Sequence, residues 1–367
     1  MPELNPPQRL LLGPGPSNVS YRVLRAMSTP LLGHLDPMFM DIMDEVCRLL
    51  RDTFQTQNHM TFPVSGTGSA GMETALVNVL QPGDQAVICI NGVFGQRLRD
   101  VAERCGAEVI AVEAEWGQPL DEQQIIDTLG EHPQARICAI VHAETSTGVL
   151  QPLTKLGSFI KETDILFVVD AVTSLGGVNL EVDAWGIDVC YSGTQKCLSV
   201  PPGLAPITFS DKAMQVLAGR KNKVQSWYLD VTMLQKYWGQ ERLYHHTAPI
   251  SMIYGLREGL GIIAEEGLQN RFKRHLEASA LLAEKLQALG FDFFAAQGHR
   301  LPSLTSVFPP QGMDVEDARR RLLAEHNIEV GGGLGPVAGK IWRIGLMGEN
   351  ADPQKVAMLI QAVEQLL

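Results

Sequence analysis

The chain of 367 residues has few charged residues and no long apolar stretch. Charged residues make up only 19% of the chain, below the roughly 25% that is usual for soluble domains. A net charge of -11 argues against nucleic acid, which favours clustered Lys and Arg. The apolar runs are short, 165–169 being among the longest, whereas a membrane span needs about 20 such residues. We therefore expect neither a nucleic-acid nor a membrane partner.

Targeting signals and paired cysteines are also missing. The run of three leucines near the N-terminus is too short for the core of a signal peptide, and the C-terminus is not a peroxisomal tripeptide. None of the six cysteines belongs to a C-x-x-C pair, and several lie inside apolar runs. We expect reduced, buried thiols and no metal site, in a cytoplasmic protein.

Apolar residues and glycine are plentiful, which excludes intrinsic disorder and points to sharp turns. Hydrophobic residues make up 45% of the chain, and 35 residues are glycine. Helical patterns at 69–80 and 96–105 alternate with short apolar runs. These runs lie at 85–90, 107–113, 135–142, 164–170, 187–192 and 204–209. Such an alternation predicts an α/β fold with a largely parallel sheet that is covered on both faces.

The pattern changes after about residue 250. Long helices are predicted at 251–266 and 271–289, with Gly290 as a C-terminal cap of the second. Short strands are predicted at 291–294, 304–308, 328–330 and 341–346, followed by a closing helix that begins at Asp352-Pro353. We predict an extended N-terminal segment (1–16), a large α/β domain (17–260) and a smaller α+β domain (261–367).

A glycine-rich turn opens the helix predicted at 69–80. The segment Gly66-Thr-Gly-Ser-Ala-Gly71 fits the dinucleotide pattern G-x-G-x-x-G, but the next strand ends in Asn91-Gly92 without the required carboxylate. A dehydrogenase is therefore disfavoured. Hydroxyls and free N–H groups at a helix N-terminus still suit an anion such as a phosphate. An ordinary tight turn is the alternative explanation.

Two ionisable residues follow later strands. Asp170 ends one strand, where α/β sheets bind ligands, and a carboxylate buried there needs a partner. Lys196 follows another strand in Ser192-Gly-Thr-Gln-Lys196, and partial burial would lower its pKa and make it a usable amine. A structural salt bridge and a surface charge are the alternatives. Together, an anion cradle, an acid and a lysine suit pyridoxal phosphate.

Motifs along nearly the whole chain then resemble those of fold-type I, class V aminotransferases of the alanine/serine–glyoxylate aminotransferase family. The matching segments are Leu12-Gly-Pro-Gly-Pro-Ser17, Ser65-Gly-Thr-Gly-Ser69, Glu144-Thr-Ser-Thr-Gly148, Val169-Asp-Ala-Val-Thr-Ser-Leu-Gly-Gly177, Tyr191-Ser-Gly-Thr-Gln-Lys196, Tyr244-His-His-Thr247 and Trp342-Arg-Ile-Gly345. The resemblance implies a large domain with a mostly parallel sheet and a smaller C-terminal α+β domain.

The resemblance also implies roles for individual residues. Lys196 would hold the cofactor covalently and shuttle a proton, and Asp170 would pair with the pyridinium nitrogen. The other implied cofactor contacts are Thr67, Gly68, Ser69 and Gln195 at the phosphate, Thr145 at the phenolic oxygen, and Phe94 and Val172 on the ring faces. Phe94 stands where the family often has tryptophan, so stacking is kept and the indole N–H is lost.

Substrate and subunit contacts follow from the same resemblance. Arg343 would clamp the substrate carboxylate, and Gly33, His34 and Tyr244 would line the donor side. Tyr244 and Thr247 would reach the phosphate of a neighbouring subunit, which implies a homodimer with shared active sites. His245 and His246 are consecutive and fit a structural role better than a metal site.

The implied reaction is a ping-pong transfer of an amino group from alanine or serine to glyoxylate. The alternatives are (S)-ureidoglycine as donor and, less favoured, a class V lyase. A cysteine desulfurase needs a nucleophilic cysteine on a C-terminal loop, whereas the last cysteine here is Cys197. A non-catalytic binding protein would leave the lysine dispensable.

Overall fold

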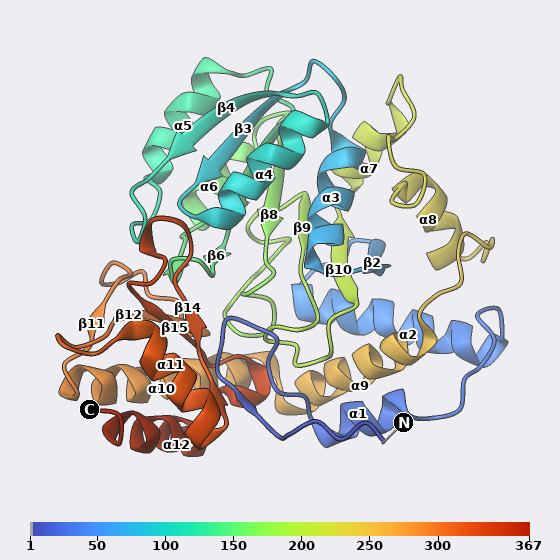
Figure 1. Ribbon diagram of the computed structural model, residues 1–367. Helices are drawn as coiled ribbons and strands as arrows, with labels where there is room; N and C mark the ends of the chain where they lie inside the picture. Colours follow the sequence, from blue (N-terminus) through green and yellow to red (C-terminus); the bar gives the residue numbers. More distant parts are fainter. Residues whose placement is uncertain (1–2) are drawn as a thin grey trace.

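The computed structural model describes residues 3–367 and consists of a large unit beside a smaller one (Figure 1). Residues 1 and 2 of the predicted N-terminal segment lie outside the described part. The large unit contains a seven-stranded sheet of β2 (Met60–Ser65), β3 (Gln85–Ile90), β4 (Glu108–Glu113), β5 (Ile137–Val141), β8 (Leu166–Asp170), β9 (Val189–Tyr191) and β10 (Leu204–Phe209). Its order is β2-β10-β9-β8-β5-β3-β4.

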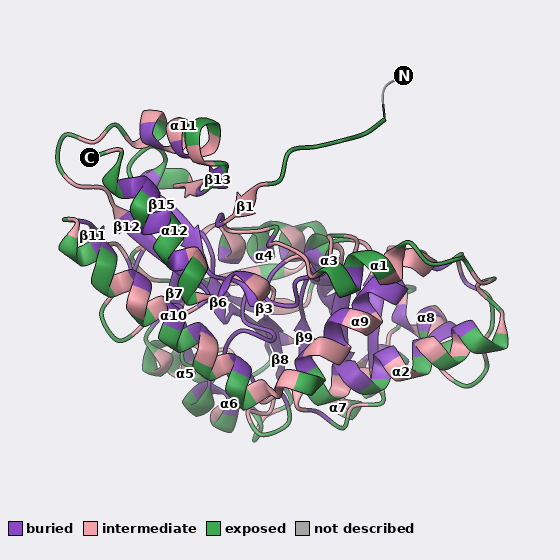
Figure 2. Cartoon of the chain, turned by 90° about the horizontal axis from the view of Figure 1, so that it is seen from below, coloured by how far each residue is buried: buried purple, intermediate pink, exposed green. Residues whose placement is uncertain are grey.

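All strands of this sheet run parallel except β10, which is antiparallel to both of its neighbours. The central strands β5 and β8 are buried along their full length, as the continuous apolar runs predict. The helices of this unit are α1 (Tyr21–Met27), α2 (Pro37–Phe54), α3 (Gly68–Val79), α4 (Val93–Arg104), α5 (Glu122–Glu131), α6 (Thr154–Ile160), α7 (Asp211–Ala218), α8 (Val231–Trp238) and α9 (Ile250–Glu266). Helices α3 and α4 cover one face of the sheet, while α5 and α6 cover the other (Figure 2).

The smaller unit follows α9 after a single residue, Gly267. It contains the helices α10 (Leu268–Ala288), α11 (Val315–His326) and α12 (Pro353–Glu364). Its sheet has the order β11-β12-β15-β14, from β11 (Asp292–Phe293), β12 (Leu304–Phe308), β14 (Gly331–Gly332) and β15 (Trp342–Gly345). The predicted fold class is confirmed, and Gly290 has a positive φ of 81° just after α10, as a C-terminal cap requires.

The N-terminal segment joins the smaller unit. Strand β1 (Leu10–Leu11) pairs in parallel with β13 (Ile328–Glu329), and the Leu12 side chain is fully buried in the apolar cluster of α10, α11 and α12. The strand predicted at 328–330 therefore pairs with the start of the chain and lies outside the four-stranded sheet. The boundaries predicted at residues 16 and 260 stay predictions.

The direction of the strands explains why the loops of Asp170 and Lys196 lie at the same edge of the sheet. Parallel strands end at the same edge of a sheet, and the ends of β8 and β9 lead directly into the loops of Asp170 and Lys196. A short hairpin of β6 (Ala143–Glu144) and β7 (Val149–Leu150) follows β5 at that edge. None of the helices within residues 3–367 combines the length and the apolar composition that a membrane crossing requires.

A buried asparagine ties α3 to the segment before α8. Asn78 is fully buried, and its Nδ2 atom donates to the carbonyl oxygens of Thr74 and Leu229, both at 2.7 Å. Its Oδ1 atom accepts from the backbone N–H of Val231 at 2.9 Å. These bonds hold the helix whose N-terminus is the predicted anion cradle.

We expect Asn78→Ala to lower the free energy of unfolding by roughly 2–4 kcal/mol, because the peptide groups of Leu229 and Val231 lose their partners. Denaturant unfolding at a fixed protein concentration measures this loss. Gln124→Ala, at an exposed position of α5, is the control, and its free energy of unfolding should stay within about 0.5 kcal/mol of that of the parent. Equal unfolding midpoints for the two variants would contradict the prediction.

Candidate active site

Lys196 lies in the turn after β9 and is only 9% exposed. Its Nζ atom donates to the carbonyl oxygen of Pro14, and a Cβ atom on Gly15 would lie 2.7 Å from its Cδ atom. The N-terminal segment therefore covers the lysine side chain closely. Burial, assisted by the positive charge of Arg343, lowers the pKa of Lys196 to about 8. A substantial fraction of the amine is thus neutral at moderately alkaline pH.

Asp170 ends β8 and is 3% exposed. Its carboxylate accepts from the backbone N–H of Val172 and from the hydroxyl of Tyr191, both at 2.8 Å. Burial raises the pKa of Asp170 to about 6, although both hydrogen bonds act in the opposite direction. Because both donors are neutral, a cation next to this carboxylate would gain a strong interaction. The contact with Tyr191 was not predicted from the sequence, because it depends on the pairing of β8 with β9.

The predicted anion cradle is the N-terminus of α3. Thr67 is the N-cap residue but makes no capping bond with its own side chain. The first N–H groups of a helix have no partner within it, so those of Gly68 and Ser69 can bind an anion. A Cβ atom on Gly68 would lie 3.2 Å from Cγ2 of Val172, which places the cradle against the loop of Asp170. The amide of Gln195 makes no hydrogen bond among the described residues, and its Oε1 atom is buried.

Glu144 is a fully buried carboxylate that belongs to one of the matching motifs but had no role predicted from the sequence. It accepts from the backbone N–H groups of Phe94 (3.1 Å), Gly95 (3.3 Å) and Ser146 (3.0 Å), and from the Ser146 hydroxyl (2.6 Å). Burial raises the pKa of Glu144, while these four donors and the α4 N-terminus favour its ionised form. Glu144 thereby fixes Phe94 relative to Thr145. The only signal in the sequence was an acid beside a strand end.

Arg343 lies on β15 and is 6% exposed. Its Nε atom donates to the carbonyl oxygen of Gly332 at 2.7 Å, and Nη1 donates to that of Thr145 at 3.1 Å. Burial lowers the pKa of Arg343 to about 10, so the group remains charged at neutral pH. Within residues 3–367 no carboxylate forms a salt bridge with it, and its Nη2 atom makes no hydrogen bond. The guanidinium can therefore bind a small carboxylate.

Gly33, His34, Tyr244 and Thr247 form a second, more exposed group. The rings of His34 and Tyr244 lie 5.1 Å apart, and the Tyr244 hydroxyl is 3.4 Å from the hydroxyl of Thr247. Tyr244 is 59% exposed, and no hydrogen bond among residues 3–367 joins this group to Lys196 or Arg343. Gly33 is exposed, and a Cβ atom added to it would meet no other atom within 4 Å. Among residues 3–367, the structure thus brings together the other predicted cofactor residues and Arg343, whereas these four form a separate group.

The two consecutive histidines lie between the two groups. The ring of His245 stacks on Trp227 at 4.5 Å, and the Nε2 atom of His246 is 2.7 Å from the hydroxyl of Ser65, just before the cradle. Burial lowers the pKa of His246 to about 4, so this ring is neutral at physiological pH. Both rings pack against aromatic neighbours, in line with the structural role expected from the sequence.

The residues of the first group fit pyridoxal phosphate. The α3 N-terminus and the unpartnered amide of Gln195 suit a phosphate, and the buried Asp170, with only neutral donors, suits a protonated ring nitrogen. The buried amine of Lys196 suits an aldehyde. Phe94 in the first turn of α4 and Val172 in the loop after β8 supply apolar side chains for the ring faces.

Comparisons with known proteins agree with this chemistry. Residues 14–346 match the family model described as aminotransferase class-V. The (S)-ureidoglycine–glyoxylate transaminase of Bacillus subtilis is 42% identical, over 100% of this chain and 92% of that protein. The alanine–glyoxylate aminotransferase of Callithrix jacchus is 43% identical, over 99% of this chain and 89% of that protein.

Solved structures give the same result. The crystal structure of an alanine–glyoxylate aminotransferase from Nostoc sp. has a TM-score of 0.98 and 49% identity, covering 100% of this chain and 97% of that one. A pyridoxamine–pyruvate aminotransferase from Mesorhizobium loti has a TM-score of 0.93 and 25% identity, covering 100% of this chain and 93% of that one. The chain belongs to the class V aminotransferase family and is a fold-type I aminotransferase that depends on pyridoxal phosphate.

Proposed function

We propose that this chain transfers the amino group of alanine or serine to glyoxylate, giving glycine and an oxo acid by a ping-pong mechanism. The observation that carries the proposal is the grouping of Lys196, a buried amine with a lowered pKa, with Asp170 and Arg343. Among residues 3–367, Arg343 forms no salt bridge with an acidic side chain. The relatives named above are glyoxylate aminotransferases, which supports glyoxylate as acceptor.

Lys196 and Asp170 would carry the proton chemistry. Bound pyridoxal phosphate supplies the electron sink that makes the substrate Cα–H bond acidic. As a neutral amine, Nζ of Lys196 would take the proton from the substrate Cα and deliver it to C4′ of the cofactor. The Asp170 carboxylate would keep a proton on the ring nitrogen, and the Tyr191 hydroxyl would hold that carboxylate in place. Burial of both groups excludes water, which strengthens these interactions.

The remaining roles follow the same placement. Thr67, Gly68, Ser69 and Gln195 would bind the phosphate, Phe94 and Val172 would enclose the ring, and Thr145 would contact the phenolic oxygen. Arg343 would bind the α-carboxylate of each substrate through its planar guanidinium, which is already oriented by two backbone carbonyls. Gly33 and His34 would line the donor side.

The donor is the less constrained part of the proposal. (S)-Ureidoglycine remains the second candidate, because a relative with 42% identity has that name. A ureido group favours amide partners, whereas the proposed donor side offers a histidine and a tyrosine. One methylene changes the free energy with which a hydrophobic pocket discriminates between two substrates by only about 1–3 kcal/mol. We therefore expect several small donors to be accepted. A class V lyase is less favoured, because Cys197 is buried and burial raises its pKa to about 11.

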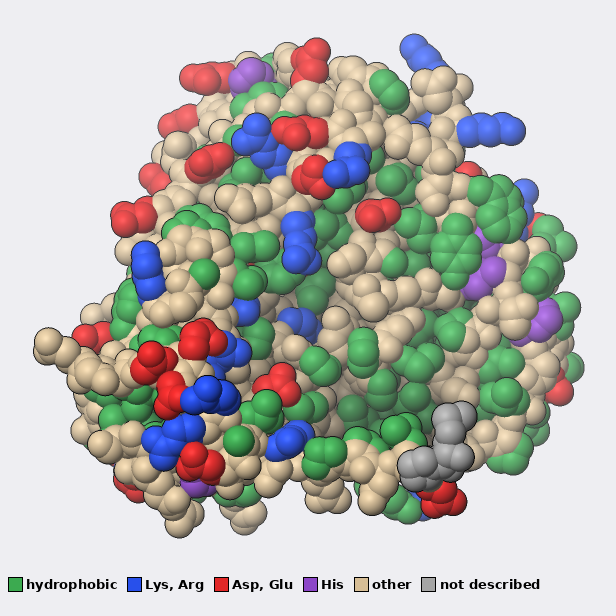
Figure 3. Space-filling view, viewed as in Figure 1, with side chains coloured by type: hydrophobic (Ala, Val, Ile, Leu, Met, Phe, Trp, Pro, Cys, Tyr) green, Lys and Arg blue, Asp and Glu red, His purple; other side chains and the backbone are tan. Residues whose placement is uncertain are grey.

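We further propose a homodimer in which Tyr244 and Thr247 serve the neighbouring subunit. Hydrophobic side chains gather on the lower right of the face in Figure 3, with histidines among them. Large exposed apolar residues of the chain include Tyr21, Leu24, Leu31, Leu35, Met38, Trp227, Tyr228, Leu243 and Tyr244. Large exposed apolar patches are typical of subunit interfaces. The six free, buried cysteines support a reducing, cytoplasmic setting.

We expect a donor screen to show glycine formation from glyoxylate with alanine or serine, and slower turnover with (S)-ureidoglycine. Serine is paired with pyruvate as the competing acceptor, since alanine with pyruvate gives no net change. Lys196→Ala is the control and should lose both the visible absorbance of the holoenzyme and the activity. Turnover of pyruvate without any reaction of glyoxylate would contradict the assignment.

The lowered pKa of Lys196 predicts how cofactor loading depends on pH. Only the neutral amine attacks an aldehyde, so the loading rate of the apoprotein should rise about tenfold per pH unit below pH 8 and level off above it. Free Nα-acetyl-lysine, measured in parallel, corrects for the ionisation of the cofactor. Arg343→Gln should move the midpoint to higher pH, because the arginine charge disfavours protonated Lys196. A midpoint near 10.5 in the parent protein would contradict burial of the amine.

Mixed dimers test whether Tyr244 and Thr247 act across the interface. Lys196→Ala is combined with the double variant Tyr244→Ala/Thr247→Ala after denaturation and refolding together, and activity is measured at limiting cofactor. If the two residues serve the partner subunit, each mixed dimer regains one intact site, and activity exceeds that of either parent variant. If they serve their own subunit, every site keeps one defect, so mixing restores nothing and the proposal fails.

A further inference from the structure

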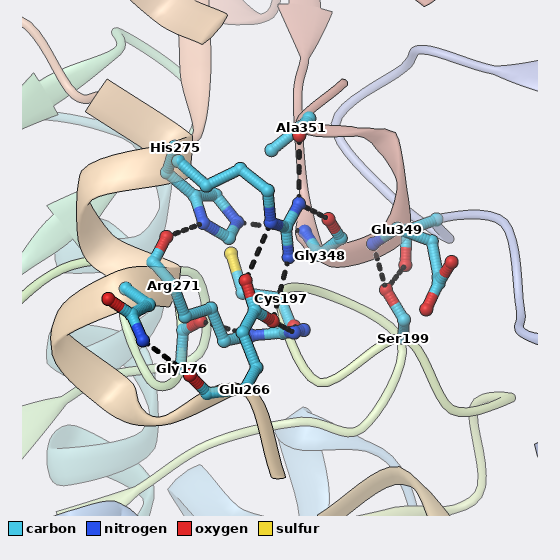
Figure 4. A network of polar contacts seen from close by, with 12 residues as sticks. Gly176, Cys197, Ser199, Glu266, Arg271, His275, Gly348, Glu349 and Ala351 are labelled. Atoms are coloured by element: carbon cyan, nitrogen blue, oxygen red, sulfur yellow. Dashed lines mark hydrogen bonds and ion pairs between the residues drawn. The ribbon is translucent and has the colours of Figure 1, made fainter. Parts of the chain in front are cut away.

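A buried arginine on α10 contacts two active-site loops at once (Figure 4). Arg271 is 2% exposed, and its Nε atom donates to the carbonyl oxygen of Gly176 at 2.9 Å. Its Nη2 atom donates to the carbonyl oxygen of Cys197 at 2.6 Å, and Nη1 donates to the carboxylate of Glu266 at 2.7 Å. The guanidinium plane therefore binds three groups in three directions.

The two carbonyls belong to the loops that carry the proposed catalytic residues. Cys197 directly follows Lys196, and Gly176 lies in the loop that starts at Asp170. The carbonyl oxygen of Lys196 itself accepts from the hydroxyl of Ser17 at 2.8 Å. Two consecutive peptide groups at the lysine are thus held by side chains from distant parts of the chain.

The same helix also holds the segment that follows Arg343. His275, fully buried, contacts the carbonyl oxygen of Arg271 through Nδ1 at 2.8 Å and accepts from the backbone N–H of Gly348 through Nε2 at 2.9 Å. Since Nε2 accepts, Nδ1 must carry the proton. Gly348 lies against the lysine loop, because a Cβ atom there would be 2.7 Å from the carbonyl oxygen of Cys197. The backbone around Lys196 and the continuation of β15 therefore share one set of contacts.

Arg274 makes a similar set of bonds without touching the lysine loop. It lies on the same helix, pairs with the same Glu266 at 2.7 Å, and donates to the carbonyl oxygens of Gly348 and Ala351, both at 2.8 Å. The two arginines differ in whether their carbonyl partners belong to active-site loops, and in burial, because the side chain of Arg274 is 32% exposed. Arg274 is therefore a control for the stabilising effect of an arginine on α10 that pairs with Glu266 and binds backbone carbonyls.

We propose that Arg271 is a positioning residue that sets the loop of Lys196 relative to the loop of Asp170. A planar guanidinium can hold two carbonyls at fixed separation, whereas the ammonium of a lysine is a single point charge on a flexible stem. A displacement of about 1 Å at a reacting group can cost on the order of 100-fold in rate. This inference rests on the proposed role of Lys196.

The test compares the holoenzyme variants Arg271→Met, Arg271→Lys and Arg274→Met. We expect both Met variants to lower the melting temperature. Only the Arg271 variants should lower kcat, by roughly 10- to 100-fold, with KM for the amino donor changed less than about threefold. They should also change the visible circular dichroism of the bound cofactor, which a loss of stability alone does not do below the unfolding transition. Arg271→Lys keeps the charge but should not restore kcat.

The outcome that overturns the proposal is an Arg271 variant with lowered melting temperature but with the kcat and circular dichroism of the parent, like Arg274→Met. If Arg271→Met does not fold, Arg271→Lys supplies the same comparison, because it retains the charge and most of the buried volume. Failure of the proposed function is distinguishable, because Lys196→Ala would then remain active whatever the Arg271 variants do.

Discussion

The structure depends on keeping ionisable groups out of water at one edge of a parallel sheet. Lys196, Asp170, Glu144 and Arg343 are all at most 9% exposed, and neutral groups supply most of their hydrogen bonds. Burial moves the pKa of the lysine down to about 8 and that of the aspartate up to about 6. Lys196 and Asp170 can therefore gain or lose a proton near neutral pH, and a charge placed beside either group would be stabilised.

Two layers of contacts keep these groups in place. Directly around the site, Tyr191 holds Asp170, and Glu144 connects the α4 N-terminus to the hairpin that carries Thr145. Further out, Arg271 joins the lysine and aspartate loops through their backbone carbonyls. The inner contacts set the pKa values of the ionisable groups, while Arg271 sets the distance between the lysine loop and the aspartate loop. Both are needed, because proton transfer depends on the pKa and on the separation of the reacting groups.

The N-terminal segment connects the smaller unit to the active site. Strand β1 adds to β13, the backbone N–H of Gly345 donates to the carbonyl oxygen of Leu12 at 2.8 Å, and Pro14 then reaches the amine of Lys196. One short stretch thus touches both the strand of Arg343 and Lys196. The sequence predicts only an extended segment here and does not reveal these contacts, because strand pairing with a partner more than 300 residues away leaves no local pattern.

The sequence by itself determined the strands that end at Asp170 and before Lys196, the glycine-rich helix N-terminus after Thr67 and the family. Apolar periodicity, turn residues and short motifs are local properties, so they can be seen without coordinates. Only the tertiary structure decided that Tyr191 holds Asp170, that Glu144 orients Phe94, and that Arg271 joins two loops. Those contacts come from strand pairing and helix packing between distant segments. An isolated arginine or glutamate in the sequence therefore cannot reveal them, because its partner is set by the fold.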